Sequence, residues 1–371
     1  RIYGAGASDM KGADACFMAL LVSLAQQQDR GYNISFILYA REEGTKLIDN
    51  GLYDLNSPSN IEPFITYITS KLVEENVSPH FCRYFGSYYV NLDKYTYDIT
   101  SSETILDQAE ELLNSDIDVK YYEDSSGIFL EYPNVPAYLI VTEYSRFSID
   151  YLIENNILNY NLICSCVFQI FTAIITMKNI FGIKHNDLHF GNIMVVETKE
   201  EYLYYQYNSI FYKVPTYGYM FKIIDWGRST YNFNKLKGDN SVFSGPGECF
   251  EQYIYTRLNH SGLEPIELDN NDWTDIVMFS HSVLYEYKDY LKDTNLQRLL
   301  TKLITSTDKE AIEIKEFDWN LYIEITVKEF NIKPNEILTN RVFNDFKVNQ
   351  RGKQKKKLNI PVDSNIYKIA L

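Results

Sequence analysis

The stretch His185-Asn186-Asp187-Leu188-His189-Phe190-Gly191-Asn192 decides how the rest of the chain is interpreted. A long apolar run, 157–183, leads directly into it. Polar and charged residues interrupt that run, which favours a buried helix beneath the loop over a membrane-spanning one. Downstream, a hydrophobic strand ends at Asp225-Trp226-Gly227. The sequence thus predicts a long helix, a polar loop and a strand that ends in an acidic residue.

The spacing of the acidic and amide residues suits phosphoryl transfer. That reaction needs an acceptor hydroxyl in position, a group that accepts its proton, and metal ions held against the phosphates. Asp187 would accept the proton, and Asn192, five residues later, would help to hold Mg²⁺. Asp225 would supply the second metal ligand.

Together the two motifs resemble the catalytic loop and the metal-binding motif of the protein-kinase-like family. The long aromatic insert that follows the loop is similar to the haspin-like proteins and the kinase-like proteins of large DNA viruses. The resemblance implies that Asp187 is the catalytic Asp and that His185 props the loop. His189 stands where the family usually has a Lys. Asp275 resembles the buried Asp that ties its helix to the loop, with Asp272 as the alternative.

The region before the loop matches the same family less completely. Glu62, in a helix that begins near Ser57, resembles the Glu that pairs with the phosphate-binding Lys, and a helix-capping Glu is the alternative. Glu143 and Tyr144 end a strand that resembles the hinge, where backbone groups would hold the adenine of ATP. No Gly-rich loop is found in the sequence. No strand Lys is found either, because Lys46, the nearest candidate, lies in a polar, loop-like context.

Residues 1–52 differ in composition and resemble another family. Ile2 to Gly12, followed by a helix, a strand and Glu42-Glu43, resembles the zinc aminoacylase and succinyl-diaminopimelate desuccinylase metallopeptidases. The resemblance implies that Asp9 bridges two metals, that Glu42 is the general base and that Glu43 is a metal ligand. No further ligands are recognisable in the sequence, so we expect this fragment to lack peptidase activity.

Charge and cysteine content restrict the partners. The net charge of −15 argues against general nucleic-acid binding and against an anionic membrane surface. Five cysteines do not form a disulfide framework, which favours a reducing compartment, the cytoplasm or the interior of a host cell. The basic run 351–357 is interpreted as part of a solvated tail. A protein substrate is the expected partner, and the oligomeric state stays open.

The predicted order of elements, with strands first and helices later, indicates an α+β fold with two kinase-like lobes, of which the N-terminal lobe is incomplete. A short α/β metallopeptidase-like fragment precedes these lobes. The expected division is the fragment at 1–52, a partial N-lobe at 53–142, a C-lobe at 143–345 and a basic tail at 346–371. Helices are predicted at 59–75, 147–155, 158–180, 272–290, 294–304, 308–314 and 319–330. Strands are predicted at 34–40, 82–91, 127–131, 137–142, 193–197, 203–213 and 219–224.

The sequence therefore predicts an ATP- and Mg²⁺-dependent, kinase-like phosphotransferase directed at Ser or Thr hydroxyls of proteins. Two alternatives stay open. The first is a catalytically impaired pseudokinase or a chimera of two unrelated pieces. The second is a zinc metallopeptidase or desuccinylase.

Overall fold

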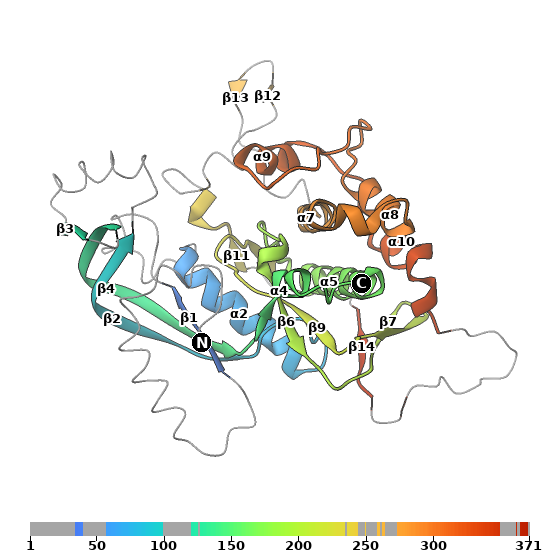
Figure 1. The fold of residues 1–371 in the computed structure, drawn as a ribbon, viewed down its shortest axis with the longest axis horizontal. Helices are drawn as coiled ribbons and strands as arrows, with labels where there is room; N and C mark the ends of the chain where they lie inside the picture. The colour runs from blue at the N-terminus through green and yellow to red at the C-terminus, as the bar shows by residue number, and fades with distance from the viewer. Residues whose placement is uncertain are drawn as a thin grey trace, which may run out of the picture. The chain divides into compact units, whose positions relative to one another are not determined.

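The computed structural model describes residues 34–39, 57–98, 120–124, 127–233, 236–243, 249, 258–259, 262–263, 273–348, 361 and 364–369. The chain divides into two units. The first comprises Arg1–Tyr53 and Tyr84–Tyr144, and the second Asp54–Arg83 and Ser145–Leu371. Strands make up the described part of the first unit, and helices and strands are mixed in the second (Figure 1). The two-lobed kinase-like arrangement stays a prediction.

The first unit contains a four-stranded antiparallel sheet built on one long strand, β4 (Gly127–Glu143). The strand β2 (Tyr84–Asp98) pairs with β4 along almost its whole length. The shorter strands β1 (Ile34–Tyr39) and β3 (Lys120–Asp124) also pair with β4, one near each of its ends. Strands 127–131 and 137–142, expected to be separate, are therefore one continuous strand.

The second unit holds the described helices and four small sheets. Its helical elements are α2 (Pro58–Glu74), α4 (Ile149–Glu154), α5 (Tyr160–Phe181), η1 (Phe190–Asn192), η2 (Ser241–Phe243), α7 (Thr274–Leu291), α8 (Asn295–Leu303), α9 (Trp319–Val327), α10 (Pro334–Leu338) and η4 (Arg341–Phe346). Its strands are β5 (Phe147–Ser148), β6 (Ile193–Glu197), β7 (Tyr202–Tyr207), β8 (Ile210–Pro215), β9 (Tyr219–Ile223), β10 (Tyr231–Phe233), β11 (Leu236–Gly238), β12 (Leu258–Asn259), β13 (Gly262–Leu263) and β14 (Ile366–Lys368). The four sheets are β5-β6-β9, β14-β7-β8, β10-β11 and β12-β13.

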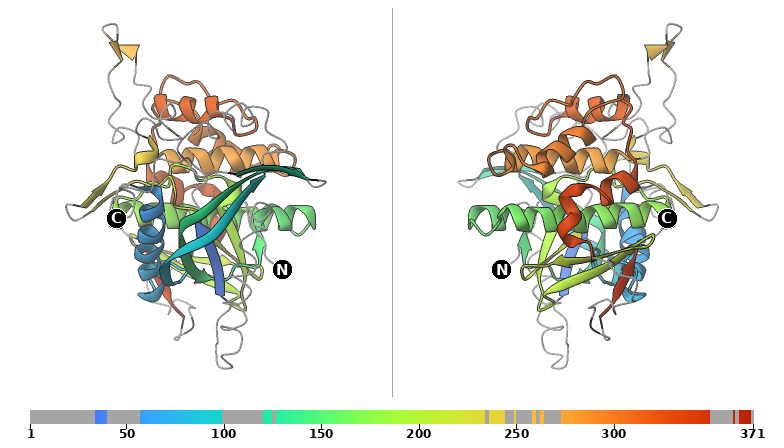
Figure 2. Two further views of the ribbon diagram at one scale, coloured as in Figure 1. Left: turned by 90° about the vertical axis from the view of Figure 1, so that its left-hand side faces the viewer. Right: turned by 90° about the vertical axis from the view of Figure 1, so that its right-hand side faces the viewer.

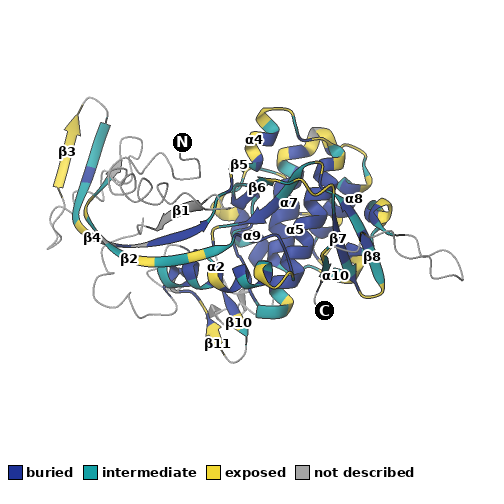
Figure 3. Ribbon diagram, turned by 90° about the horizontal axis from the view of Figure 1, so that it is seen from below, coloured by how far each residue is buried: buried dark blue, intermediate teal, exposed yellow. Residues whose placement is uncertain are grey.

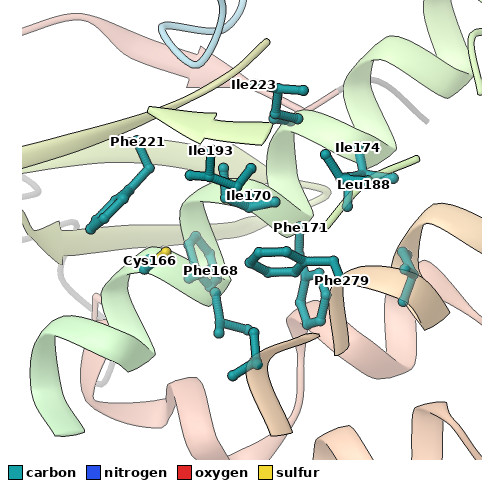
Figure 4. Close-up of a cluster of buried hydrophobic side chains, with 14 of the residues drawn as sticks. Cys166, Phe168, Ile170, Phe171, Ile174, Leu188, Ile193, Phe221, Ile223 and Phe279 are labelled. Atoms are coloured by element: carbon teal, nitrogen blue, oxygen red, sulfur yellow. The ribbon is translucent and has the colours of Figure 1, made fainter. Parts of the chain in front are cut away.

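The helix α5 forms the centre of the second unit. Its N-terminus is capped by the Asn159 side chain, whose oxygen accepts from the backbone N–H groups of Asn161 and Leu162. Sixteen consecutive residues, Leu162 to Met177, are buried (Figure 3). Phe171 packs edge-on against Phe279 of α7, which runs alongside α5 (Figures 2 and 4). A helix that is apolar all round needs such cover on every side.

Length and composition alone would let α5 cross a membrane, and among the described residues it is the one helix for which this holds. However, 89% of its apolar window is buried inside the protein. Aromatic side chains surround Phe168, namely Tyr205, Tyr212, Phe343 and Phe346. The apolar surface of α5 is therefore satisfied by protein contacts, as expected of a core helix.

Two strands frame the loop that follows α5. The strand β6 begins at Ile193, directly after the loop, and pairs antiparallel with β9, so that Ile193 lies opposite Ile223. The strand β9 ends two residues before Asp225. The backbone N–H of Ile224 also donates to the carbonyl of Asn192, at 3.1 Å. Strand pairing thus brings the two acidic motifs together.

Candidate functional site

The first turn of α7 anchors the loop 185–192 through Asp275. Its two carboxylate oxygens accept from the backbone N–H groups of His185, at 2.7 Å, and Asn186, at 2.8 Å. Asp275 is buried, and hydrogen bonds from two peptide groups satisfy its charge there. The role expected for Asp275 thus corresponds to an observed contact, whereas the alternative Asp272 lies outside the described residues.

His185 joins the loop to the end of β9. Its Nε2 lies 2.8 Å from the carbonyl oxygen of Ile224. A carbonyl can only accept, so Nε2 carries the proton. The imidazole also packs against the Trp226 ring, with 5.0 Å between the centroids. These contacts indicate that His185 has a structural role and supports the loop from beneath.

Asp187 presents a partly exposed carboxylate, and three groups lie around its Oδ1. The hydroxyl of Tyr322 donates a hydrogen bond to this oxygen. The guanidinium of Arg228 lies 3.6 Å from it, and Nε2 of His189 lies 3.8 Å from it. All three contacts converge on one oxygen of the carboxylate.

His189 and Asn192 complete the turn of the loop. The backbone N–H of Gly191 donates to Nδ1 of His189, at 3.1 Å, so the proton of the neutral ring is on Nε2. Burial lowers the pKa of His189, which favours this neutral form, although Asp187 acts in the opposite direction. The Asn192 amide donates to the backbone carbonyl of Asp187, at 2.8 Å. That bond directs the NH₂ group inward and keeps the amide oxygen available as an acceptor.

Asp225 and Glu62 form a second acidic pair. Asp225 is exposed and has a φ of 67°, in the left-handed region that few non-glycine residues adopt. Glu62 is buried on α2, and its Oε2 has no hydrogen-bond partner among the described residues. Burial, and then the nearby charge of Asp225, raise the pKa of Glu62 well above its usual value. A protonated Glu62 is the form that this environment favours.

The remaining predicted site residues lie elsewhere. Glu143 and Tyr144 end the first unit, at and just after the last residue of β4. Asp9, Glu42 and Glu43 lie outside the described residues. The sequence interpretation did not include Arg228 and Tyr322. Arg228 could have been found, because it directly follows the Asp225-Trp226-Gly227 motif. Tyr322 lies 135 residues after Asp187 and gives no sequence signal.

The described residues do not supply a complete metal site. Protein zinc sites use three or four ligands, mainly Cys, His and carboxylates. No group of three or more His, Cys, Asp or Glu residues that could hold a metal is found in the described part of the chain. Asn192 and Asp225 offer two oxygen ligands.

Comparison with known proteins relates the chain to a peptidase family and to a viral protein. The family model described as "Peptidase family M20/M25/M40" matches residues 1–294. The chain is also 31% identical over 131 residues to the uncharacterized protein 098R of Invertebrate iridescent virus 6. That match covers 31% of this chain and 21% of the viral protein, so it spans about a fifth of that relative's length.

The family match contradicts the expectation of a kinase-like family, of an ATP-dependent phosphotransferase and of ATP as cofactor. The loop pattern misleads because its chemistry is not unique to phosphoryl transfer. A carboxylate base beside oxygen ligands also serves hydrolysis, in which water replaces the acceptor hydroxyl. The features specific to nucleotide binding, a Gly-rich loop and a strand Lys, were not found in the sequence.

Proposed function

The chain belongs to peptidase family M20/M25/M40, and on that premise we propose that it is a hydrolase of amide bonds. The family match over residues 1–294 carries this proposal. The matched region includes the acidic residues of 1–52 as well as the loop 185–192. Peptides or N-acylated amino acids are the proposed substrate class.

Within the described residues, Asp187 is the group best placed to act as a general base. Its Oδ1 is occupied by the Tyr322 hydrogen bond, which leaves Oδ2 to take a proton from an attacking water. The guanidinium of Arg228, 3.6 Å from Oδ1, places a positive charge beside the Asp187 carboxylate. It would stabilise the negative charge that develops on the carbonyl oxygen of a cleaved amide.

A second acidic set lies in residues 1–52. By resemblance, Asp9 and Glu43 would hold the zinc or other divalent metal that the family typically uses, and Glu42 would be the base. Glu42 would then take a proton from a water that such a metal would make more acidic. The two sets assign the base to different residues, Glu42 or Asp187, and this difference can be tested.

The test is hydrolysis by the full chain, supplied with Zn²⁺, Co²⁺ or Mn²⁺, against a panel of dipeptides and N-acyl amino acids. Metal content is measured on the same samples. Wild type is compared with Glu42→Gln and Asp187→Asn, both close in shape to the original side chain. Loss of a catalytic base lowers kcat by about 10²- to 10⁴-fold.

Metal-dependent hydrolysis that is lost in Glu42→Gln would assign the base to the N-terminal set. Hydrolysis lost in Asp187→Asn would assign it to the loop. If no metal gives turnover of any amide on the panel by wild type, the proposal is wrong.

A further inference from the structure

The segment around α9 covers the loop at two points. Phe317, just before α9, lies with its ring 5.8 Å from that of His189 and 5.5 Å from that of Tyr322. Tyr322, within α9, donates its hydroxyl hydrogen to Asp187. The segment therefore reaches two polar side chains of the loop, His189 and Asp187.

Local contacts fix the α9 segment in this position. The side chain of Asp318 caps the helix by accepting from the backbone N–H of Leu321, at 2.7 Å. Lys315 pairs with Asp318 at 2.8 Å. Leu321 and Ile325 are fully buried. The helix end that carries Tyr322 is thus anchored independently of Asp187.

The Tyr322 ring also packs against Arg228. The Arg228 guanidinium lies over the ring, 5.6 Å from the centroid. Burial, and then the neighbouring Asp187, raise the pKa of the Tyr322 hydroxyl above its usual value. The hydroxyl therefore keeps its proton near neutral pH and acts as a donor. By contrast, Arg228 and His189 lie beyond hydrogen-bond distance of Oδ1, at 3.6 Å and 3.8 Å.

We propose that Tyr322 is the positioning residue of Asp187: its hydroxyl fixes Oδ1, so that Oδ2 is the oxygen presented to substrate. This inference rests on the proposed function for the identity of the reaction, but the contact itself can be measured without turnover. Tyr322 lies far from the loop in sequence and on a separate helix, which makes α9 part of the site.

Tyr322→Phe removes the hydroxyl and keeps the ring that packs on Phe317 and Arg228. Two readouts are compared with wild type. The first is carbodiimide labelling of Asp187 with an amine, followed by peptide mass spectrometry and normalised to the exposed Glu154. The second is kcat and KM for amide hydrolysis. Tyr290→Phe, at a half-exposed tyrosine of α7, is the matched control.

Labelling of Asp187 is expected to rise by about tenfold in Tyr322→Phe, the size expected from losing one hydrogen bond to a charged group. Where Asp187→Asn has assigned the base to the loop, kcat should fall by a similar factor or more with KM nearly unchanged; where Glu42→Gln has assigned it to the N-terminal set, the labelling of Asp187 alone should change. Tyr290→Phe should match wild type in both readouts.

Equal labelling of Asp187 in wild type and Tyr322→Phe would overturn the positioning role. A rise in kcat would also overturn it, because the hydroxyl would then block the base. If labelling responds to Tyr322 while wild type hydrolyses no amide, positioning stands and the proposed hydrolase function fails.

Discussion

At the scale of single residues, Asp275 holds the loop by two hydrogen bonds that only a carboxylate can accept together. In Asp275→Asn one oxygen becomes an NH₂ group, which faces the backbone N–H of His185 or Asn186. We expect the free energy of unfolding to fall by about 1.5–3 kcal/mol, the range for a hydrogen bond to a charged group. Urea unfolding at pH 7 measures this. The exposed Asp293→Asn should change it by less than about 0.5 kcal/mol, and equal effects would contradict the anchoring role.

His80 makes stability depend on pH. It is fully buried, donates from Nδ1 to the carbonyl of Phe221 at 2.8 Å and accepts from the Tyr205 hydroxyl at 2.7 Å. Burial lowers the pKa of His80 from 6.5 to about 3. The folded protein keeps the ring neutral, whereas the unfolded chain binds a proton below pH 6.5. Stability that is fully present above pH 6.5 is therefore lost as pH falls towards 3, by up to about 1.4 kcal/mol per pH unit.

Urea unfolding of wild type and His80→Gln at pH 7.5, 6.5, 5.5 and 4.5 tests this pH dependence. Gln has no titrating group, so the variant should be less stable at pH 7.5 yet lose less stability between pH 6.5 and 4.5. Parallel curves for the two proteins would show that His80 does not contribute to the acid sensitivity.

At the scale of elements, the end of α5 depends on a glycine. Gly182 has a φ of 59° and its N–H donates to the carbonyl of Lys178, which closes the helix. A Cβ at this position would lie 2.3 Å from the backbone oxygen of Asn232. We expect Gly182→Ala to lower the free energy of unfolding by about 2–4 kcal/mol, from backbone strain and the clash together.

Gly218→Ala is the matched control for this substitution. Gly218 also has a positive φ, 87°, but nothing lies within 4 Å of a Cβ there. Backbone strain alone predicts a loss of about 1–2 kcal/mol. Thermal or urea unfolding of both variants compares them, and equal losses would mean that the Asn232 contact is relieved by local movement.

Periodicity predicted the helices of the second unit well, since their apolar faces are locally encoded. The expected helix 158–180 is α5 (Tyr160–Phe181), and the expected strand 193–197 is β6. Pairing was harder to predict. The single strand expected at 203–213 is the hairpin β7–β8, which turns at Asn208, a residue with a φ of 55°. The helix expected at 308–314 is absent, and Thr305 instead forms a bridge with Ala311.

In the candidate site, the sequence identified residues that lie within a motif and missed a residue that tertiary packing brings in from a distant position in the chain. Asp187, Asn192 and Asp225 were recognisable because their spacing along the chain carries the chemistry. Tyr322 was not, because only packing of α9 onto the loop brings it to Asp187. The reaction type was mistaken for a related reason. A base and two oxygen ligands do not by themselves specify whether a hydroxyl or a water is activated.

At the scale of the whole chain, the C-terminal segment adds a strand that the expectation of a solvated tail did not include. The strand β14 (Ile366–Lys368) pairs in parallel with β7, so that Ile366 lies opposite Tyr204. The backbone N–H of Ile369 donates to the carbonyl of Gln206, at 2.9 Å, and its side chain is buried. Residues about 160 positions apart in sequence are thereby joined, a contact that local pattern cannot reveal.

Removing residues 361–371 should therefore destabilise the second unit. The deletion exposes the edge of β7 and the apolar surface that Ile369 and Tyr367 cover, and the Tyr367 ring lies 5.7 Å from that of Tyr205. Burial of one or two such side chains contributes about 2–4 kcal/mol, which corresponds to a fall in Tm of at least about 4 °C for a unit of this size. Differential scanning calorimetry measures the shift. Ser364→Ala, outside the strand, is the control and should keep the wild-type Tm. An unchanged Tm in the deletion variant would mean that β14 contributes nothing to stability, and that the edge of β7 is stable when exposed to solvent.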